Sequence, residues 1–395
     1  MNILFQTYNK VLSTKVGTER TTVTVASCLA KRYGCKCFSI YEEETDSPKE
    51  PCFEKEFRWS IGKDHEDSIR KLREIIITNS IDCIIIQGAF IHVARFRRAI
   101  EGLKCKLIFA HHFEPGWEMQ YFSFSHFRKL PGHPSAIGLL RWAKTILLFP
   151  VKKNFYAENL KALYREAYEN ADTTVLLSST LESPYRDFSG LKDSSKFKFI
   201  PNGLSFDHSI NRDEIKNKGR NVLIVSRLSD PDKKLSVALR IWAKVKRNPV
   251  AAGWVLKIVG GGEDEGLYRN IIRDENIPDV TLEGRQNPEP YYREASLFMM
   301  TSKSESWGLT LTESQQFGVV PIAFDSYPSL REIITDGENG FIIPNNDIDA
   351  YANKMLELMH DEGLRHEIAL KALESSHRFS QGSIVEKWWT LITKQ

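Results

Sequence analysis

Short apolar and β-branched runs alternate with amphipathic stretches along most of the chain. In the first half, this pattern predicts strands at residues 3–6, 37–40, 81–86, 106–109, 174–177 and 197–200. Helices are predicted between these strands at about residues 18–32, 67–78 and 90–100. The same alternation resumes with strands at residues 222–225, 255–259, 280–282, 297–300 and 320–323. Strands that alternate with helices in this way favour α/β architecture, with parallel sheets and helical crossovers.

A break in the pattern divides the chain. Pro201-Asn202-Gly203 and the polar stretch 211–220 separate the two alternations, and 395 residues exceed what one hydrophobic core usually serves. We therefore predict two facing Rossmann-like domains, residues 1–203 and residues 204–379. A last helix at about residues 382–393 is expected to return to the first domain, so that residues 380–395 belong with it.

The composition narrows the class of protein. A formal charge of +3 is close to balance, whereas a nucleic-acid partner usually demands a strong basic excess. There is no apolar run long enough to predict a transmembrane helix, and the polar start argues against a signal peptide. The six cysteines include no CxxC pair, so they are predicted to be reduced thiols rather than zinc ligands. These features predict a cytoplasmic protein.

One segment, residues 121–164, has a different composition. Its seven lysines and arginines accompany a single acid, Glu158, and aromatic and aliphatic residues are interleaved with them. Such a segment suits contact with an anionic membrane or a lipid acceptor, which would hold the protein peripherally at the inner membrane face. The alternative is a pair of core helices whose lysines face water.

The segment 301–324 contains two glutamates, Glu305 and Glu313, with a glycine between them. If a helix begins at Trp307-Gly308, Glu305 lies in the preceding loop and Glu313 lies within the helix, on the order of 10 Å away. That spacing suits opposite ends of a nucleotide-sugar, although two glutamates on a solvated helix would have the same spacing. The helix start predicts a diphosphate site at four N–H groups, those of Trp307, Gly308, Leu309 and Thr310.

A second candidate cluster follows the strand at 222–225. Arg227 lies in the loop after this strand, and Lys233 precedes the next helix, with Lys234 able to share its role. An arginine and a lysine can offset the negative charge of a departing nucleoside diphosphate; surface charges at a strand end are the alternative. We expect Asp230 and Asp232 to orient these cations, and we predict neither a metal ion nor a cofactor.

Other candidates rest on single features. The glycines at 260–262 predict a tight turn that permits close approach of a ligand, and the backbone around Arg285 is a candidate for contact with a base. His112, at the end of the strand 106–109, could contact the transferred sugar or the acceptor, although a structural role is the alternative. Gly17 precedes a helix and suits a phosphate or acceptor.

In this order, the segments resemble family 4 of the retaining glycosyltransferases, which have the GT-B fold. The resemblance covers nearly the whole chain and rests on VGTER at 16–20, IPNG at 200–203, SRLSDPDK at 226–233, VGGGED at 259–264, SESWGLTLTESQQFGVVPIAFD at 304–325 and EIITDGENGFIIP at 332–344. The E-x7-E block is its specific element. The chain departs from the family pattern in two places: the first motif has a single glycine, and the histidine is the doublet His111-His112. His112 is the favoured match, because Pro115 follows it at the offset that is usual in the family.

The resemblance implies a role for each matching residue. Glu313 would hold the ribose hydroxyls, Glu305 the donor sugar, Arg227 and Lys233 the diphosphate, and His112 would lie beside the sugar. The implied reaction is metal-independent, retaining transfer of a hexose-type sugar from a nucleotide-sugar, often a UDP-sugar, to a glycan or lipid-linked acceptor in surface polysaccharide or lipopolysaccharide synthesis. A nucleotide-sugar epimerase and a non-catalytic nucleotide-sugar-binding protein are the alternatives.

Overall fold

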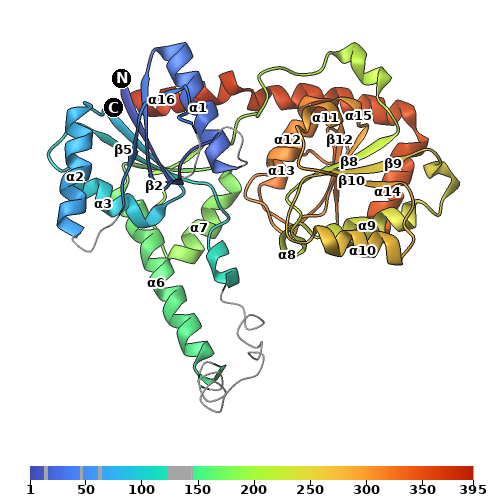
Figure 1. Cartoon of the computed structure of the whole chain (residues 1–395), viewed down its shortest axis with the longest axis horizontal. Coiled ribbons are helices and arrows are strands. Elements are labelled where there is room, and N and C mark those ends of the chain that lie inside the picture. Colours follow the sequence, from blue (N-terminus) through green and yellow to red (C-terminus); the bar gives the residue numbers. More distant parts are fainter. Residues whose placement is uncertain (13–16, 45–47, 61–64, 122–143, 145, 395) are drawn as a thin grey trace. The chain divides into compact units, whose positions relative to one another are not determined.

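The chain forms two compact units, each built around its own parallel sheet (Figure 1). The computed structural model describes residues 1–12, 17–44, 48–60, 65–121, 144 and 146–394. The first unit comprises Met1–Ala26 and Ala30–Phe199, and the second comprises Ser27–Leu29 and Ile200–Gln395. Val16 of the first motif, and residues 122–143 and 145 of the basic segment, lie outside the described residues.

The first unit contains a seven-stranded parallel sheet in the order β3-β2-β1-β4-β5-β6-β7. Its strands are β1 (Asn2–Asn9), β2 (Lys36–Glu43), β3 (Phe53–Arg58), β4 (Cys83–Gln87), β5 (Lys106–His111), β6 (Thr173–Leu176) and β7 (Phe197–Phe199). Its helices are α1 (Thr18–Tyr33), α2 (His65–Thr78), α3 (Val93–Ala99), α6 (Phe149–Asn170) and α7 (Glu182–Ser189). The central strand β4 is buried along its whole length, and its neighbours β1 and β5 over most of theirs, because helices cover both faces of a parallel sheet.

The second unit contains a six-stranded parallel sheet in the order β10-β9-β8-β11-β12-β13. Its strands are β8 (Asn221–Val225), β9 (Val255–Val259), β10 (Val280–Gly284), β11 (Leu297–Met300), β12 (Val320–Phe324) and β13 (Phe341–Ile343). Its helices are α8 (Asp230–Lys233), α9 (Leu235–Val245), α10 (Glu265–Asp274), α11 (Glu289–Glu294), α12 (Leu309–Gln316), α13 (Leu330–Ile333), α14 (Ile348–His360), α15 (Glu362–Ser376) and α16 (Gln381–Thr393). The strand order reverses between β8 and β11, which marks the topological switch point of this sheet.

Most of the predicted elements are confirmed, and two strands were missed. The charged strand β3 lies at an edge of its sheet, where its polar side chains face water and mask the apolar alternation. Strand β13 has only three residues, too few to give a periodic signal. All six cysteines are free thiols, and none of the described helices is long and apolar enough to cross a membrane.

Candidate active site

The candidate residues of the second unit follow the carboxyl ends of three neighbouring strands. Arg227 follows β8, the three glycines at 260–262 follow β9, and Glu305 follows β11. Strands β8 and β11 flank the switch point, where open α/β sheets leave a crevice for ligands. Sheet topology therefore gathers segments that are far apart in the sequence at one edge.

Lys233 and Glu305 form an ion pair at this edge. Ser302 Oγ donates a hydrogen bond of 2.7 Å to the same carboxylate oxygen, Glu305 Oε1. The Lys233 carbonyl in turn accepts a hydrogen bond of 3.0 Å from Thr301 Oγ1. The two side chains are 20% and 18% exposed, so both can be reached from solvent. Since each charge neutralises the other, a diphosphate would have to compete with Glu305 for Lys233.

The neighbouring lysine has a different environment. Lys234 Nζ donates a hydrogen bond of 2.8 Å to Asn346 Oδ1, in the loop before α14. Its backbone adopts the left-handed conformation with φ of 49°, which ends α8 and separates the two side chains. The two lysines of the motif therefore bind different partners, and only Lys233 contacts Glu305.

Arg227 is exposed and is oriented by Asp232. Arg227 Nη2 donates a hydrogen bond of 2.6 Å to Asp232 Oδ2, which also accepts one of 3.3 Å from Ser229 Oγ. The interpretation of Asp232 as a residue that orients a cation is confirmed. For Asp230 it is wrong, because its carboxylate accepts hydrogen bonds from Ser236 N and Oγ, at 2.8 and 2.9 Å, and stabilises the start of α9. The described residues contain no group of three His, Cys, Asp or Glu that could hold a metal ion.

The glycine turn after β9 brings two backbone loops together. A Cβ atom built on Gly260 would lie 1.8 Å from the carbonyl oxygen of Ser226, and one on Gly262 would lie 2.2 Å from that of Leu228. Leu228 N also donates a hydrogen bond of 3.2 Å to Gly261 O. The tight turn is confirmed, and the close approach observed is to the loop that carries Arg227.

The fourth candidate cation, Arg285, follows strand β10 and lies beside the same turn. A Cβ atom on Gly261 would lie 2.8 Å from Arg285 Cγ, so the arginine stem packs on the glycine. The Arg285 side chain is otherwise exposed. It lies beside the loop of Arg227 but contacts neither Glu305 nor Lys233 through any hydrogen bond or ion pair among the described residues.

Helix α12 begins where the sequence predicts, directly after Gly308. Gly308 has φ of 94°, and a Cβ atom there would lie 2.6 Å from Tyr327 Oη, so both conformation and space require glycine. Leu309 and Thr310 belong to the first turn of α12, and the N–H groups of a first turn have no acceptor within their own helix. Trp307 is buried, with its ring 5.3 Å from that of Phe379.

Glu313 lies in α12 and is only 1% exposed. Two protein hydroxyl groups, those of Ser205 and Tyr292, donate hydrogen bonds to its two carboxylate oxygens, the second at 2.9 Å. Glu313, the residue predicted to bind the ribose, is therefore buried in this structure. Its carboxylate already accepts hydrogen bonds from two hydroxyl groups of the protein. Sequence reasoning missed Ser205 and Tyr292, since they lie 108 and 21 residues away.

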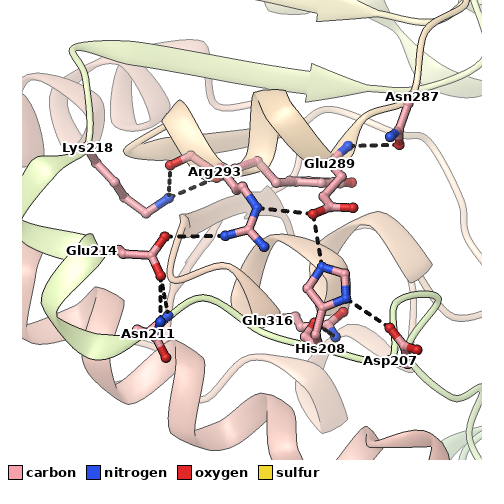
Figure 2. A network of polar contacts seen from close by, with 10 residues as sticks. Asp207, His208, Asn211, Glu214, Lys218, Asn287, Glu289, Arg293 and Gln316 are labelled. Carbon is pink, nitrogen blue, oxygen red and sulfur yellow. Dashed lines mark hydrogen bonds and ion pairs between the residues drawn. The ribbon is translucent and has the colours of Figure 1, made fainter.

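A polar network fixes the segment that follows Ser205 (Figure 2). His208 bonds with Glu289 Oε1 and Asp207 Oδ1, each at 2.9 Å, and Arg293 bridges Glu289 and Glu214 at 3.1 and 3.3 Å. The Glu289 hydrogen bond, followed by that of Asp207, raises the pKa of His208.

The same segment is tied directly to the helix of Glu313. Gln316 Nε2, in α12, donates hydrogen bonds of 2.9 and 2.7 Å to the carbonyl oxygens of Phe206 and His208. Lys218 Nζ donates to three carbonyl oxygens near the end of α11, including Tyr292 O at 2.8 Å, and burial lowers its pKa to about 7. These contacts hold Ser205 and Tyr292 near Glu313.

In the first unit, the two adjacent histidines have different environments. His111 is fully buried among aromatic rings, including those of Tyr164 and Tyr185 at 5.2 and 5.4 Å. Burial, with a smaller effect of His112, lowers the pKa of His111 to about 3, so its ring is neutral near pH 7. This environment is that of a structural residue.

His112 contacts the end of the neighbouring strand instead. Its Nε2–H donates a hydrogen bond to Gln87 Oε1, at the end of β4. An acceptor at Nε2 fixes the proton there and leaves Nδ1 as the acceptor nitrogen of the neutral ring. Sequence reasoning missed Gln87, although its position as the last residue of a buried strand was an available signal. Gly17, with φ of 82°, directly precedes α1, as predicted.

Several known proteins resemble this chain in sequence or in fold. Residues 206–374 match the family model described as "Glycosyl transferases group 1". An exopolysaccharide phosphotransferase of Streptomyces coelicolor is 35% identical over 179 residues, which is 45% of this chain but only 19% of that protein. An uncharacterized glycosyltransferase of Haemophilus influenzae is 24% identical over 381 residues, covering 94% of this chain and 95% of the other.

Among solved structures, HepE of Anabaena in complex with UDP-glucose has a TM-score of 0.71. The sequences are 17% identical, and the alignment covers 100% of this chain and 99% of HepE. At this identity the likeness concerns the fold, which confirms the predicted GT-B architecture with its two Rossmann-like units and C-terminal helix. The family match concerns the second unit, to which residues 206–374 belong.

Proposed function

We propose that the chain is a glycosyltransferase that transfers a hexose-type sugar from a UDP-sugar to a glycan or lipid-linked acceptor. The observation that carries this proposal is the Lys233–Glu305 pair at the switch point of a group 1 domain, with Arg227 in the adjacent loop. The two cations can bind a diphosphate, and the carboxylate beside them can accept hydrogen bonds from sugar hydroxyls. Surface polysaccharide or lipopolysaccharide synthesis is the proposed process, and the exopolysaccharide named for one relative supports it.

In the proposed complex, the diphosphate draws Lys233 away from Glu305 and binds Arg227 and the first N–H groups of α12. Glu305 is then free to accept hydrogen bonds from hydroxyls of the donor sugar. Glu313 exchanges the hydroxyls of Ser205 and Tyr292 for those of the ribose. The family resemblance adds His112 as a contact of the sugar, Gly17 as a phosphate or acceptor contact, and the backbone at Arg285 as a contact of the base.

The proposed reaction is the retaining transfer of family 4, and it uses neither a metal ion nor a cofactor. The bond between the anomeric carbon and the β-phosphate oxygen breaks, and the bond to the acceptor oxygen forms on the same face of the sugar. The acceptor proton moves to the departing phosphate oxygen. Lys233 and Arg227 stabilise the charge that grows on this diphosphate, which is the contribution that preorganised cations make to such steps.

The proposal is tested with the purified chain and a panel of UDP-, GDP- and ADP-sugars, with and without EDTA. We expect nucleotide release from one UDP-sugar, unchanged by EDTA, with water as the acceptor and the freed sugar appearing first in the anomeric configuration of the donor. Glu305→Gln should lower the rate at least about 100-fold. The matched control Glu386→Gln changes an exposed glutamate of α16 and should leave the rate unchanged. Sugar isomerisation without nucleotide release would contradict the proposal.

A further inference from the structure

The amino-terminal half of α6 and the helical residues directly before it expose a row of large apolar side chains. Leu147, Val151 and Phe155 are 78%, 67% and 70% exposed. They are four residues apart, and hydrogen bonds from Leu148 N to Lys144 O and from Lys152 N to Leu148 O continue the helical backbone through this stretch. A spacing of four residues puts the three side chains on one side of the helix. We call these three residues the α6 stripe.

No other described part of the chain has a comparable row. The remaining large hydrophobic residues classed as exposed are scattered singly and reach at most 53%, as at Ile77 of α2. In the carboxyl-terminal half of α6, by contrast, Leu160 and Tyr164 are buried. The helix is thus anchored in the first unit at one end, while its other end projects away from the sheet of that unit (Figure 1).

Lysines accompany the α6 stripe. Lys144, Lys152 and Lys153 are exposed, and none of them forms an ion pair with another residue in the described part of the chain. The nearest acid along the chain, Glu158, is paired with Lys161 at 2.7 Å. The projecting end of the helix therefore combines exposed apolar area with uncompensated positive charge.

We propose that the α6 stripe docks on a lipid bilayer with anionic headgroups. Apolar side chains on one side of a projecting helix can enter the headgroup region, while the lysine ammonium groups remain among the lipid phosphates. Charge complementarity selects this partner, because an apolar protein groove would not need three lysines that form no ion pair with another described residue. The proposal goes beyond sugar transfer and does not depend on it, since docking requires neither donor nor acceptor.

Sedimentation with vesicles tests the proposal on the full chain. We expect the protein to bind vesicles of equimolar phosphatidylcholine and phosphatidylglycerol, and to bind pure phosphatidylcholine much less. Val151→Ser combined with Phe155→Ser should weaken this binding roughly tenfold or more. Lys152→Glu combined with Lys153→Glu should weaken it as well, and higher ionic strength should weaken binding of the unmodified chain. Ile77→Ser, at an exposed apolar position of α2, is the matched control and should bind like the unmodified chain.

Because the changed side chains are exposed, thermal unfolding should stay unchanged in all of these variants. The proposal is overturned if the unmodified chain stays in the supernatant, if it binds both lipid compositions equally, or if the Val151→Ser and Phe155→Ser variant binds like the control. Sedimentation velocity without lipid provides a further check. A dimer that dissociates in the same variant would assign the stripe to a second copy of the chain and would also overturn the proposal.

Discussion

The two sheets have the same parallel architecture, but the residues at their carboxyl edges differ in chemistry. In the second unit, Arg227, Lys233 and Glu305 are charged and can be reached from solvent. In the first unit, Gln6 within β1, Gln87 at the end of β4 and His112 after β5 are amides and an imidazole, and all are buried. The charges near this edge, in the Lys10–Glu44 pair, follow β1 and β2. The architecture explains where both groups lie, and the side chains decide what each can bind.

The difference suggests different ligands for the two edges. Paired ions that solvent can reach are suited to exchange one partner for a phosphate. Buried amides are suited to hydroxyl groups, and Gln6 Oε1 and Gln87 Nε2 have no hydrogen-bond partner among the described residues. Leaving such a group without a partner costs about 1–3 kcal/mol, so a water molecule or ligand hydroxyl would stabilise it. The comparison can be tested by changing each edge separately.

The largest expected effect comes from a substitution in the second unit that distinguishes the role in sugar binding from the role in diphosphate binding. Glu305→Gln should lower transfer by about 10²–10³-fold, because the group that we propose to contact the sugar is neutralised. The affinity of this variant for UDP should stay the same or rise, since Lys233 loses the Glu305 carboxylate that competes with the diphosphate. Initial rates with the UDP-sugar and calorimetric titration with UDP measure the two quantities. A parallel loss of UDP affinity would contradict the separate roles of the two residues.

A second effect concerns the glycine turn that supports Arg227. Gly262→Ala should destabilise the second unit by about 2–3 kcal/mol, because the new methyl group meets the Leu228 carbonyl. The melting temperature should fall by several degrees. Gly266→Ala is the matched control: it lies in α10 with nothing within 4 Å of its Cβ, and should raise stability by about 0.5–1 kcal/mol. Equal melting temperatures would show that the two loops can separate without cost.

In the first unit, a smaller effect is expected from Gln87, the last residue of β4. Gln87→Leu removes the acceptor for His112 Nε2–H and should lower transfer roughly tenfold, as expected for one lost hydrogen bond. Nitrogen NMR of the histidines should show His112 protonated at Nε2 in the unmodified chain and a mixture of tautomers in the variant. Gln87→Glu keeps an acceptor and should keep the tautomer. An unchanged tautomer in Gln87→Leu would rule out this positioning role.

The smallest effect is the pH dependence of the network in Figure 2. The raised pKa of His208 means that its contribution to stability is complete below about pH 6.5, the unfolded value, and is lost as the pH rises through the folded value. His208→Gln should therefore lower the free energy of unfolding by less than about 1 kcal/mol at pH 6, because the His208–Glu289 pair is partly exposed. The loss should be smaller still at pH 9, where His208 is no longer protonated. Chemical unfolding of both proteins at the two pH values measures this difference. A larger cost at pH 9 would contradict the ion-pair account.

How far sequence reasoning reached depends on the range of each interaction. The loop position of Glu305 and the start of α12 follow from local signals, since Gly308 is required where it stands. The Lys233–Glu305 contact joins residues 72 positions apart, and only the strand order brings them together. The burial of Glu313 depends on distant hydroxyl groups that no local pattern reveals. Distance along the chain, rather than residue type, thus limited the prediction of the site.

The most direct test of the central claim is calorimetric titration of the chain with UDP. The account predicts that the unmodified chain binds UDP and that Lys233→Ala lowers the affinity at least about tenfold, as expected for a lost charged contact. Lys234→Ala is the matched control, because this adjacent lysine binds Asn346 instead, and it should bind UDP like the unmodified chain. UDP binding that survives Lys233→Ala, or that falls equally in Lys234→Ala, would contradict the assignment of the diphosphate to this edge.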